Sequence, residues 1–310
     1  MEKTEQERVD HFVARFRERA PLFCKEIQRA LKEDGDLFSE LAGPMLAWAS
    51  VMLGPSYEDI LIDKYSDFVL NVNMSQFEYE KKGKYQFSSW QEVYEKTYDQ
   101  KDFMDSYHWG VYTHTFAWYH HLKIYEFFRD KFLLPMAARK EGGRLLDLGA
   151  GSGIWHLLAN RHLPQWDITA VDISETSIGL SREMAQKTVP EASIEHFCAD
   201  ATAFQASAPA DAAICCFLME HLERPEEVLN NISRNLKERC FAFVTCGLTG
   251  AEIDHIFEFK RESEPILMAE QAGLRVVRMF SASPSRVLQK RKYLPRSLAM
   301  VVQKRKNEIW

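Results

Sequence analysis

The spacing of apolar residues changes character near residue 142. Before this point apolar side chains recur every three or four residues, and Glu5–Arg19 places them on one helix face. After it, short apolar runs rich in β-branched and aromatic residues alternate with amphipathic segments. The pattern therefore predicts a helical N-terminal region over residues 1–141 and an α/β region over residues 142–310.

Proline and glycine are expected to interrupt the helical region. The interruptions fall at Pro21, Gly35, Pro44 and Pro55. Tyr65–Tyr85 is compatible with a helix or a loop. Ser88 and Ser89, followed by Gln91 and Glu92, are typical of a helix start. The stretch from Phe103 to Leu134 predicts one long helix or two, ended by Pro135.

The second region predicts strands that alternate with helices. The strands are Arg144–Leu148, Ile168–Asp172, Ile194–Cys198, Ala212–Phe217, Phe241–Cys246, Leu274–Phe280 and Leu298–Gln303. The helices are Ile154–His162, Glu175–Gln186, Pro225–Lys237 and Glu262–Ala272. Such alternation favours a parallel sheet covered by helices on both faces. No helix joins the last two strands, which indicates an antiparallel pair at one edge.

The composition limits the classes of partner that the protein is expected to bind. The 310 residues carry a formal net charge of −6 and are 46% apolar, as in a soluble globular protein. The charge gives no general attraction to nucleic acid or to an anionic membrane, and the apolar run Ala213–Met219 is too short to span one. The basic segment Gln289–Arg296 is interpreted as a solvated sheet edge. The first residues lack the apolar core of a signal peptide, so we expect a cytoplasmic protein.

The segment RLLDLGAGSG, Arg144–Gly153, is the strongest functional signal. Its glycines allow a tight turn and a close approach of the backbone to a ligand. The spacing is D-x-G-x-G-x-G, whereas dinucleotide-binding folds use G-x-G-x-x-G. The third glycine comes one residue too early for that motif, and a carboxylate precedes the first.

Carboxylates at the ends of the first three strands indicate the ligand. Asp172 ends the second strand, where a carboxylate accepts hydrogen bonds from ribose hydroxyls. Asp200 follows the third strand, where it could accept from an adenine amino group. The carboxylate of Asp147 suits a positively charged group of the ligand rather than a pyrophosphate. These features together predict S-adenosylmethionine, although Asp172 and Asp200 could also be helix N-caps.

Residues 144–247 resemble class I S-adenosylmethionine-dependent methyltransferases. LLDLGAGSG is similar to the first motif of that family, VDIS to the second and CADAT to the adenine-contacting turn. DAAICCFLMEHLERPEEVL is similar to the fourth-strand segment, and Phe241–Gly247 with the later AEQAGLRVV to the closing part. The resemblance implies a Rossmann-like, mostly parallel sheet of seven strands with an antiparallel last strand.

The resemblance also implies which residues hold the cofactor. Contacts with the methionine part are expected from Asp147, Gly149, Ala150 and Gly151, and contacts with the ribose from Asp172 and Ile173. Asp200 and Ala201 are expected at the adenine, and Cys216 and Phe217 are expected beneath the cofactor.

Methyl transfer needs an aligned acceptor and often a base that removes its proton. His221 lies just past the fourth strand, and His255 lies in a long loop after the fifth strand, next to Asp254. A neighbouring carboxylate could raise the basicity of an imidazole. The alternatives are a structural hydrogen bond for His221 and a packing role for His255.

The segment YHWGVYTHTFAWYHH, Tyr107–His121, holds four histidines among aromatic residues. Helical metal sites use i, i+4 pairs, and this spacing is absent, so no metal is predicted. Our hypothesis is that the segment caps the cofactor cleft and selects the substrate. Its candidate pocket residues are Tyr107, Tyr112, His114 and Tyr119, with His114 and Tyr119 as further candidate bases. The alternative is an aromatic packing helix.

The sequence thus predicts a methyltransferase that acts on a small molecule. YDQKDFMDSYHWG and DHIFEF resemble segments of helical extensions on bacterial small-molecule methyltransferases of specialised metabolism, which include 2-oxo acid C-methyltransferases. That resemblance implies C-methylation next to a carbonyl, while O- or N-methylation is equally compatible. A regulator that binds S-adenosylmethionine without catalysis is the alternative class. Exposed aromatic residues on the N-terminal helices would favour a homodimer.

Overall fold

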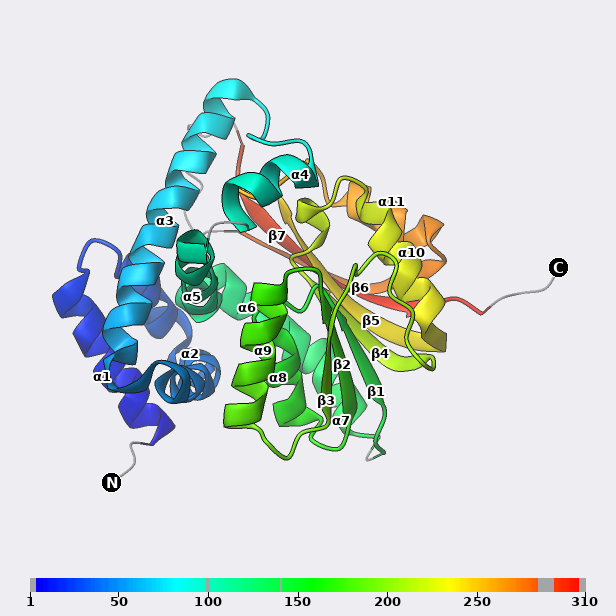
Figure 1. Cartoon of the computed structure of the whole chain (residues 1–310), viewed down its shortest axis with the longest axis horizontal. Helices are drawn as coiled ribbons and strands as arrows, with labels where there is room; N and C mark the ends of the chain where they lie inside the picture. Colours follow the sequence, from blue (N-terminus) through cyan, green and yellow to red (C-terminus); the bar gives the residue numbers. More distant parts are fainter. Residues whose placement is uncertain (1–3, 99–100, 140, 284–292, 307–310) are drawn as a thin grey trace.

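The computed structural model describes residues 4–98, 101–139, 141–283 and 293–306. The part before residue 140 is helical and lies beside a mixed α/β part (Figure 1). Its helices are α1 (Glu5–Arg19), α2 (Lys25–Leu53), α3 (Tyr57–Lys82), α4 (Trp90–Val93), α5 (Lys101–Ala117), α6 (Tyr119–Phe128) and α7 (Leu134–Ala137). The helices of the α/β part are α8 (Ile154–His162), α9 (Glu175–Thr188), α10 (Pro225–Asn235) and α11 (Ser263–Gln271).

The sheet has seven strands in the order β3-β2-β1-β4-β5-β7-β6. The strands are β1 (Arg144–Leu148), β2 (Asp167–Asp172), β3 (Ile194–Cys198), β4 (Ala210–Cys216), β5 (Leu236–Leu248), β6 (Leu274–Ala282) and β7 (Arg296–Lys304). The first five strands are parallel, and β7 runs antiparallel to both β5 and β6. The Rossmann-like fold predicted from the sequence, with its antiparallel last strand, is confirmed.

The helix breaks predicted from proline are wrong at two positions. Pro44 lies inside α2, where it is buried with Leu41 and Leu46, so tertiary packing outweighs the loss of one helical hydrogen bond. Pro135 lies in the first turn of α7 instead of ending a helix. The break expected at Gly35 occurs as a kink at Asp34, whose φ is −158° and ψ is 70°.

The ambiguous segment Tyr65–Tyr85 belongs mostly to α3, which ends at Gly83 with a φ of 73°. The predicted stretch from residue 103 to 134 is broken at Trp118, whose backbone is extended with φ −91° and ψ 120°. The chain therefore turns between α5 and α6, and this turn carries the histidine-rich segment into the interior of the protein.

Two continuous cores hold the elements together. One extends from α1 and α2 through α6 to α8 and one face of the sheet, so the helical part and the α/β part share apolar contacts. The other lies on the opposite face of the sheet, beneath α10 and α11. The α3–α5 crossing is close, because a Cβ at Gly110 would lie 2.5 Å from Cβ of Phe68.

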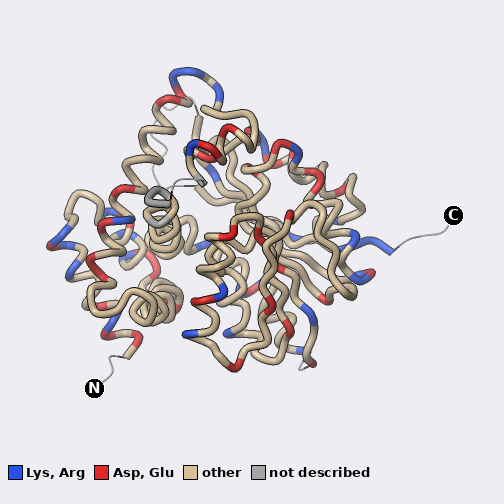
Figure 2. The backbone as a smooth tube through the Cα atoms, viewed as in Figure 1, with Lys and Arg blue, Asp and Glu red and all other residues tan. Residues whose placement is uncertain are grey.

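Charged residues of both signs are interspersed along the chain (Figure 2). Across the α1–α3 interface Arg15 pairs with Asp59, and Arg19 pairs with Asp63. In the basic segment predicted at a sheet edge, residues 289–292 lie outside the described residues. Arg296, at its end, begins β7 and pairs with Glu262.

Within Lys25–Lys82, a window of 18 residues has a mean hydropathy of 1.3 and could cross a membrane by length and composition alone. The protein itself buries 56% of that window. Leu37, Phe38 and Leu41 of α2 belong to the first core.

Candidate functional site

The glycine segment forms the turn between β1 and α8. Gly149, Gly151 and Gly153 have φ values of 78°, 53° and 91°, in the region that favours glycine. A Cβ at Gly149 would lie 2.7 Å from Leu218, and one at Gly153 would lie 2.6 Å from Ser181 Oγ. A Cβ at Gly151 would meet no atom within 4 Å, because this glycine faces a cavity. The turn thus exposes its middle to a ligand.

Asp172 holds this turn in place. Its Oδ2 accepts a hydrogen bond of 2.8 Å from the Gly151 N–H, and its Oδ1 accepts one of 2.8 Å from the Ser174 N–H. Burial raises the pKa of the Asp172 carboxyl, although these two N–H donors act against the shift. Asp172 and its neighbour Ile173 both line the cavity, where the sequence predicts the ribose contacts.

The remaining predicted cofactor residues follow the same edge of the sheet. Asp200 accepts hydrogen bonds from the backbone and side chain of Thr202 and lines the cavity with Ala201. Cys216 and Phe217 line it at the end of β4. Phe217 has a φ of 54°, and its ring stacks on His121 with centroids 5.0 Å apart. The structure therefore brings together the residues predicted from the turn and from three strand ends.

Asp147 is the exception among the predicted cofactor contacts. Its side chain is 1% exposed, it does not line the cavity, and its Oδ2 lies 2.8 Å from Nδ1 of His156. Burial raises the pKa of the Asp147 carboxyl, opposed by the His156 imidazole. The predicted direct contact with the methionine part is corrected: Asp147 connects β1 to α8 beneath the turn, because its side chain faces the helix.

The cavity has a volume of about 890 Å³ and lies between the glycine turn and the helical part. Its walls include side chains from α2, α3 and α5 as well as the ends of β1, β2, β4 and β5. Many of the walls from the helical part are apolar or aromatic, among them Phe23, Tyr65, Val69, Val72, Tyr107 and Trp118. The helical part therefore encloses the space next to the predicted cofactor residues.

Two tyrosines of the histidine-rich segment do not reach this cavity. The Tyr112 hydroxyl is buried and donates a hydrogen bond of 2.6 Å to the Met45 carbonyl. The Tyr119 ring faces Arg29, whose guanidinium carbon lies 4.4 Å from the ring centroid. The predictions of Tyr112 as a pocket residue and of Tyr119 as a base are wrong, because both side chains pack against residues of α2.

His114 does line the cavity, together with His120 and His121. The His121 ring lies 4.5 Å from each of the other two, measured between centroids. Burial lowers the pKa of His114 to about 4 and that of His120 to about 3. His114 Nδ1 donates to the Val111 carbonyl at 2.6 Å, which leaves its Nε2 as an acceptor. These imidazoles are therefore neutral near pH 7.

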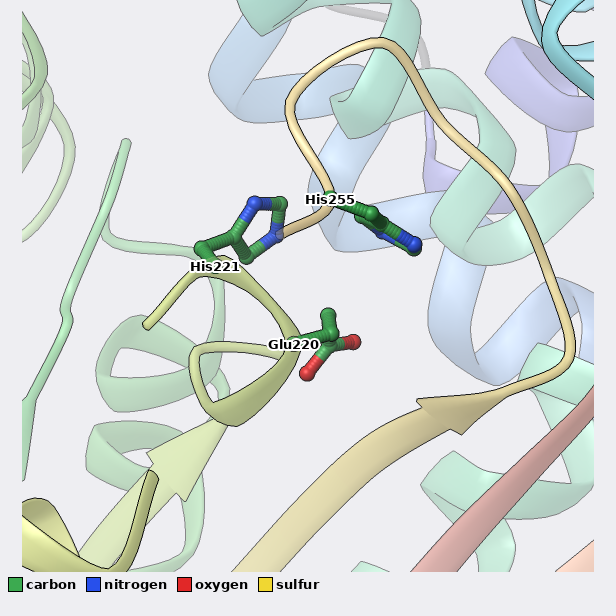
Figure 3. A group of neighbouring side chains, drawn as sticks. All are labelled: Glu220, His221 and His255. Atoms are coloured by element: carbon green, nitrogen blue, oxygen red, sulfur yellow. The ribbon is translucent and has the colours of Figure 1, made fainter. Parts of the chain in front are cut away.

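A second polar group lies at the ends of β4 and β5 (Figure 3). It contains the predicted bases His221 and His255, whose ring centroids are 4.9 Å apart, and Glu220. Glu252 and Asp254 are close to it, and with His255 they form a second cluster of potential ligand atoms. We name Glu220, His221 and His255 the acid–imidazole corner, and all three line the cavity.

The pKa values of the two imidazoles of the corner are shifted in opposite directions. Burial lowers the pKa of His221, but the carboxylates of Asp254, Glu220 and Glu252 outweigh it and raise the pKa overall. Burial, helped by His221, lowers the pKa of His255 to about 4. Sequence reasoning found both histidines and missed Glu220. The sequence did contain a signal for Glu220: it is an acidic residue directly before His221, at the carboxyl end of a parallel strand.

Comparisons with known proteins agree with this geometry. Residues 145–239 match the family model described as a methyltransferase domain. The match shows that residues 145–239 form a methyltransferase domain, and the sheet order and the glycine turn agree with the class I S-adenosylmethionine-dependent type. S-Adenosylmethionine is the methyl donor of that family. A search of curated proteins finds no match.

Solved structures with a similar fold are distant in sequence. A protein from Galdieria sulphuraria described as a sarcosine dimethylglycine methyltransferase is 16% identical, with a TM-score of 0.48 over 60% of this chain and 86% of its own. A protein from Bacillus halodurans described as a methyltransferase is 14% identical, with a TM-score of 0.45 over 57% of this chain and 98% of its own. The [4+2]-cyclase SpnF is 17% identical, with a TM-score of 0.45 over 56% of this chain and 80% of its own.

Proposed function

We propose that this protein transfers the methyl group of S-adenosylmethionine to a small molecule bound in the cavity between the glycine turn and the helical part. The observation that carries the proposal is the shared cavity. Asp172 and Asp200 line one part of it, and the acid–imidazole corner lines another. Small-molecule sites typically enclose about 300–1,000 Å³, and this cavity is at the upper end of that range.

The walls favour an acceptor with an apolar or aromatic body and one polar end. Val69 and Val72 of α3 and Tyr107 of α5 would contact the body. The polar end would face the acid–imidazole corner. Such an acceptor fits a small molecule of specialised biosynthesis better than a macromolecule, because residues 4–98 and 101–139 contribute the helices that enclose the cavity.

The reaction is an in-line displacement. The acceptor's electron pair forms the new bond to the methyl carbon, and the electrons of the S–CH₃ bond remain on sulfur, which becomes the thioether of S-adenosylhomocysteine. The acceptor loses a proton before or during transfer. Alignment can lower the barrier by up to about 7–11 kcal/mol, and proton removal typically contributes about 10²–10⁴-fold.

The acid–imidazole corner is where we place the removal of that proton. It stands at the carboxyl ends of β4 and β5, where open α/β sheets bind their ligands. An acceptor hydroxyl and a C–H next to a carbonyl both need this step, so O-methylation and C-methylation would use the same residues. His114 is a second candidate, because its Nε2 is free to accept a proton.

Incubation with methyl-labelled S-adenosylmethionine and a panel of phenols, carboxylic acids and oxo acids tests the proposal. Transfer of label to any of them supports it. Binding of S-adenosylhomocysteine with no transfer to any acceptor supports the regulator instead.

Once an acceptor is known, His114→Ala should lower turnover. Tyr119→Phe is the matched control from the same segment, because its ring faces Arg29 outside the cavity. Unchanged turnover in His114→Ala would remove α5 from the acceptor site.

A further inference from the structure

The acid–imidazole corner has the composition of a metal site. Glu220, His221 and His255 each offer one ligand atom, and these atoms all lie within 4.8 Å of one another (Figure 3). Nitrogen and oxygen ligands of one Zn²⁺ lie about 2.0–2.2 Å from the ion, which separates them by roughly 3–4 Å. Shifts of about an ångström would therefore bring all three to a common ion.

Both imidazoles are held in the orientation that metal ligands require. His221 Nδ1 lies 3.1 Å from the Asp254 carbonyl oxygen and 3.4 Å from its carboxylate. His255 Nδ1 lies 2.7 Å from the Gly250 carbonyl oxygen. A carbonyl oxygen only accepts, so each Nδ1 donates its proton there, and Nε2 is the ring nitrogen left to bind an ion. Metal-binding histidines in proteins are fixed by the same kind of hydrogen bond.

Glu220 supplies an independent observation. Its side chain is 1% exposed, and its Oε1 accepts a hydrogen bond of 2.8 Å from the Gly247 N–H. Its Oε2 is buried and has no hydrogen-bond partner within the part of the chain that the structure describes. A buried carboxylate oxygen without a donor costs free energy, and a bound cation removes that cost.

The charges around the corner also favour a cation. Glu252 and Asp254 add two carboxylates to that of Glu220. Two arginines that line the same cavity are engaged by other acids: Arg224 pairs with Glu226 and Glu227, and Arg296 pairs with Glu262. The corner thus gathers carboxylates next to imidazoles, a donor set that suits a positive ion.

We propose that Glu220, His221 and His255 bind a divalent transition-metal ion that takes an oxygen atom of the methyl acceptor in an open coordination position. Two imidazole ligands select an ion such as Zn²⁺, Fe²⁺ or Co²⁺ over Mg²⁺ or Ca²⁺. The role of the ion rests on the proposed function, since the corner shares its cavity with the cofactor residues. The acceptor is accordingly a molecule with a hydroxyl, carboxylate or carbonyl oxygen at its polar end.

The ion changes how the acceptor loses its proton. A bound cation stabilises negative charge on the acceptor oxygen and so lowers the pKa of a hydroxyl or of a C–H next to a carbonyl. His221 and His255 would then act as ligands, and the acceptor's proton would pass to Nε2 of His114, the second candidate base in the same cavity. The metal-free site expected from the sequence is revised by this proposal, because ligands from the ends of two strands meet only in the folded chain.

Metal titration of the whole protein tests the site without reference to activity. After treatment with a chelator, Co²⁺ is added while visible absorption is recorded, and Zn²⁺ binding is measured by calorimetry. We expect one ion per chain, which excess Mg²⁺ does not displace. Glu220→Gln and His255→Ala should weaken Zn²⁺ binding by more than about 100-fold, beyond the effect typical of an outer partner. His11→Ala is the matched control, because His11 pairs with Glu58 outside the cavity.

Calorimetry with S-adenosylhomocysteine on the same samples separates the two proposals and reports whether the variants fold. Wild-type protein that binds S-adenosylhomocysteine but neither Co²⁺ nor Zn²⁺ overturns the metal site and leaves methyl transfer standing. Equal Zn²⁺ affinity in wild type and both ligand variants also overturns it. Zn²⁺ binding without S-adenosylhomocysteine binding would support the three ligands and contradict the proposed function. The wild-type titration decides the question even where a variant fails to fold.

Discussion

The carboxylate of Asp147 lies 2.8 Å from Nδ1 of His156, and both side chains are buried beneath the glycine turn. His156 Nε2 in turn lies 3.3 Å from Ser181 Oγ on α9. The pair therefore connects β1, α8 and α9 below the turn that is predicted to hold the cofactor. This arrangement explains why a carboxylate precedes the first glycine although it does not line the cavity.

His156→Ala should destabilise the protein by about 3–5 kcal/mol, because it leaves the Asp147 carboxylate buried without its partner. Urea unfolding measures this change. Asp147→Asn keeps the volume and one hydrogen bond, so its loss should be smaller. If Asp147 touched the cofactor directly, Asp147→Asn would instead weaken S-adenosylhomocysteine binding with unchanged stability.

Substitution by alanine should affect ligand binding at one glycine of the turn and protein stability at another. Gly151→Ala projects a methyl group into the cavity, where no atom lies within 4 Å, so it should weaken S-adenosylhomocysteine binding and cost only about 1–2 kcal/mol of backbone strain. Gly153→Ala would place its Cβ 2.6 Å from Ser181 Oγ and 3.0 Å from the His156 ring, so it should mainly lower the melting temperature. Calorimetry and thermal melts of both variants make the comparison. Equal effects on binding and stability would contradict the orientation described for the turn.

The buried histidines predict that the folded protein loses stability as the pH falls. The pKa of His114 is lowered to about 4 and that of His120 to about 3, whereas an unfolded histidine titrates near 6.5. Between these values the unfolded chain binds more protons than the folded chain, so stability should fall as the pH drops from about 6.5 towards 4. Urea unfolding at several pH values measures the slope.

His120→Phe should make that slope shallower. The phenyl ring retains the stacking on Trp118, where the His120 ring now lies 5.4 Å away, and it removes the buried Nδ1 that has no hydrogen-bond partner in the described residues. Stability near pH 7 should be retained. An unchanged slope would show that His120 is not neutral in the folded state.

Asp254→Asn should weaken Zn²⁺ binding by about 10–100-fold while the three ligands stay in place, because the Asp254 carboxylate lies 3.4 Å from the Nδ1–H of His221. The backbone carbonyl of Asp254 still accepts from that nitrogen, so the loss should be smaller than in His255→Ala. Competition with a chromophoric chelator measures the affinities. A loss as large as that of His255→Ala would make Asp254 a direct ligand.

Much of the α/β part could be predicted from local patterns. The apolar runs identified every strand, and β1 and β3 have the predicted bounds. Glycines at fixed spacing after β1 predicted the turn, because only residues that tolerate positive φ can form it. Asp172 and Asp200 were predicted as ligand contacts from their places at the end of β2 and just after β3. These features depend on residues close together in the sequence.

The helical part was predicted less well for the same reason. Pro44 lies buried inside a continuous helix, and Trp118 turns the chain without a proline or glycine. Tyr112 and Tyr119 pack against residues of α2 outside the cavity, whereas His114 lines it. The directions of these side chains depend on packing against α2, which no local spacing encodes.

The sequence by itself determined the class of fold and the cofactor, and it predicted the edge of the sheet for the cofactor site, because strand periodicity and glycine spacing are local properties. Only the tertiary structure decided that Asp147 turns to His156 and that Glu220 joins His221 and His255. Those contacts join segments separated along the chain, and they form only when the sheet brings the ends of β4 and β5 to the same side of the molecule.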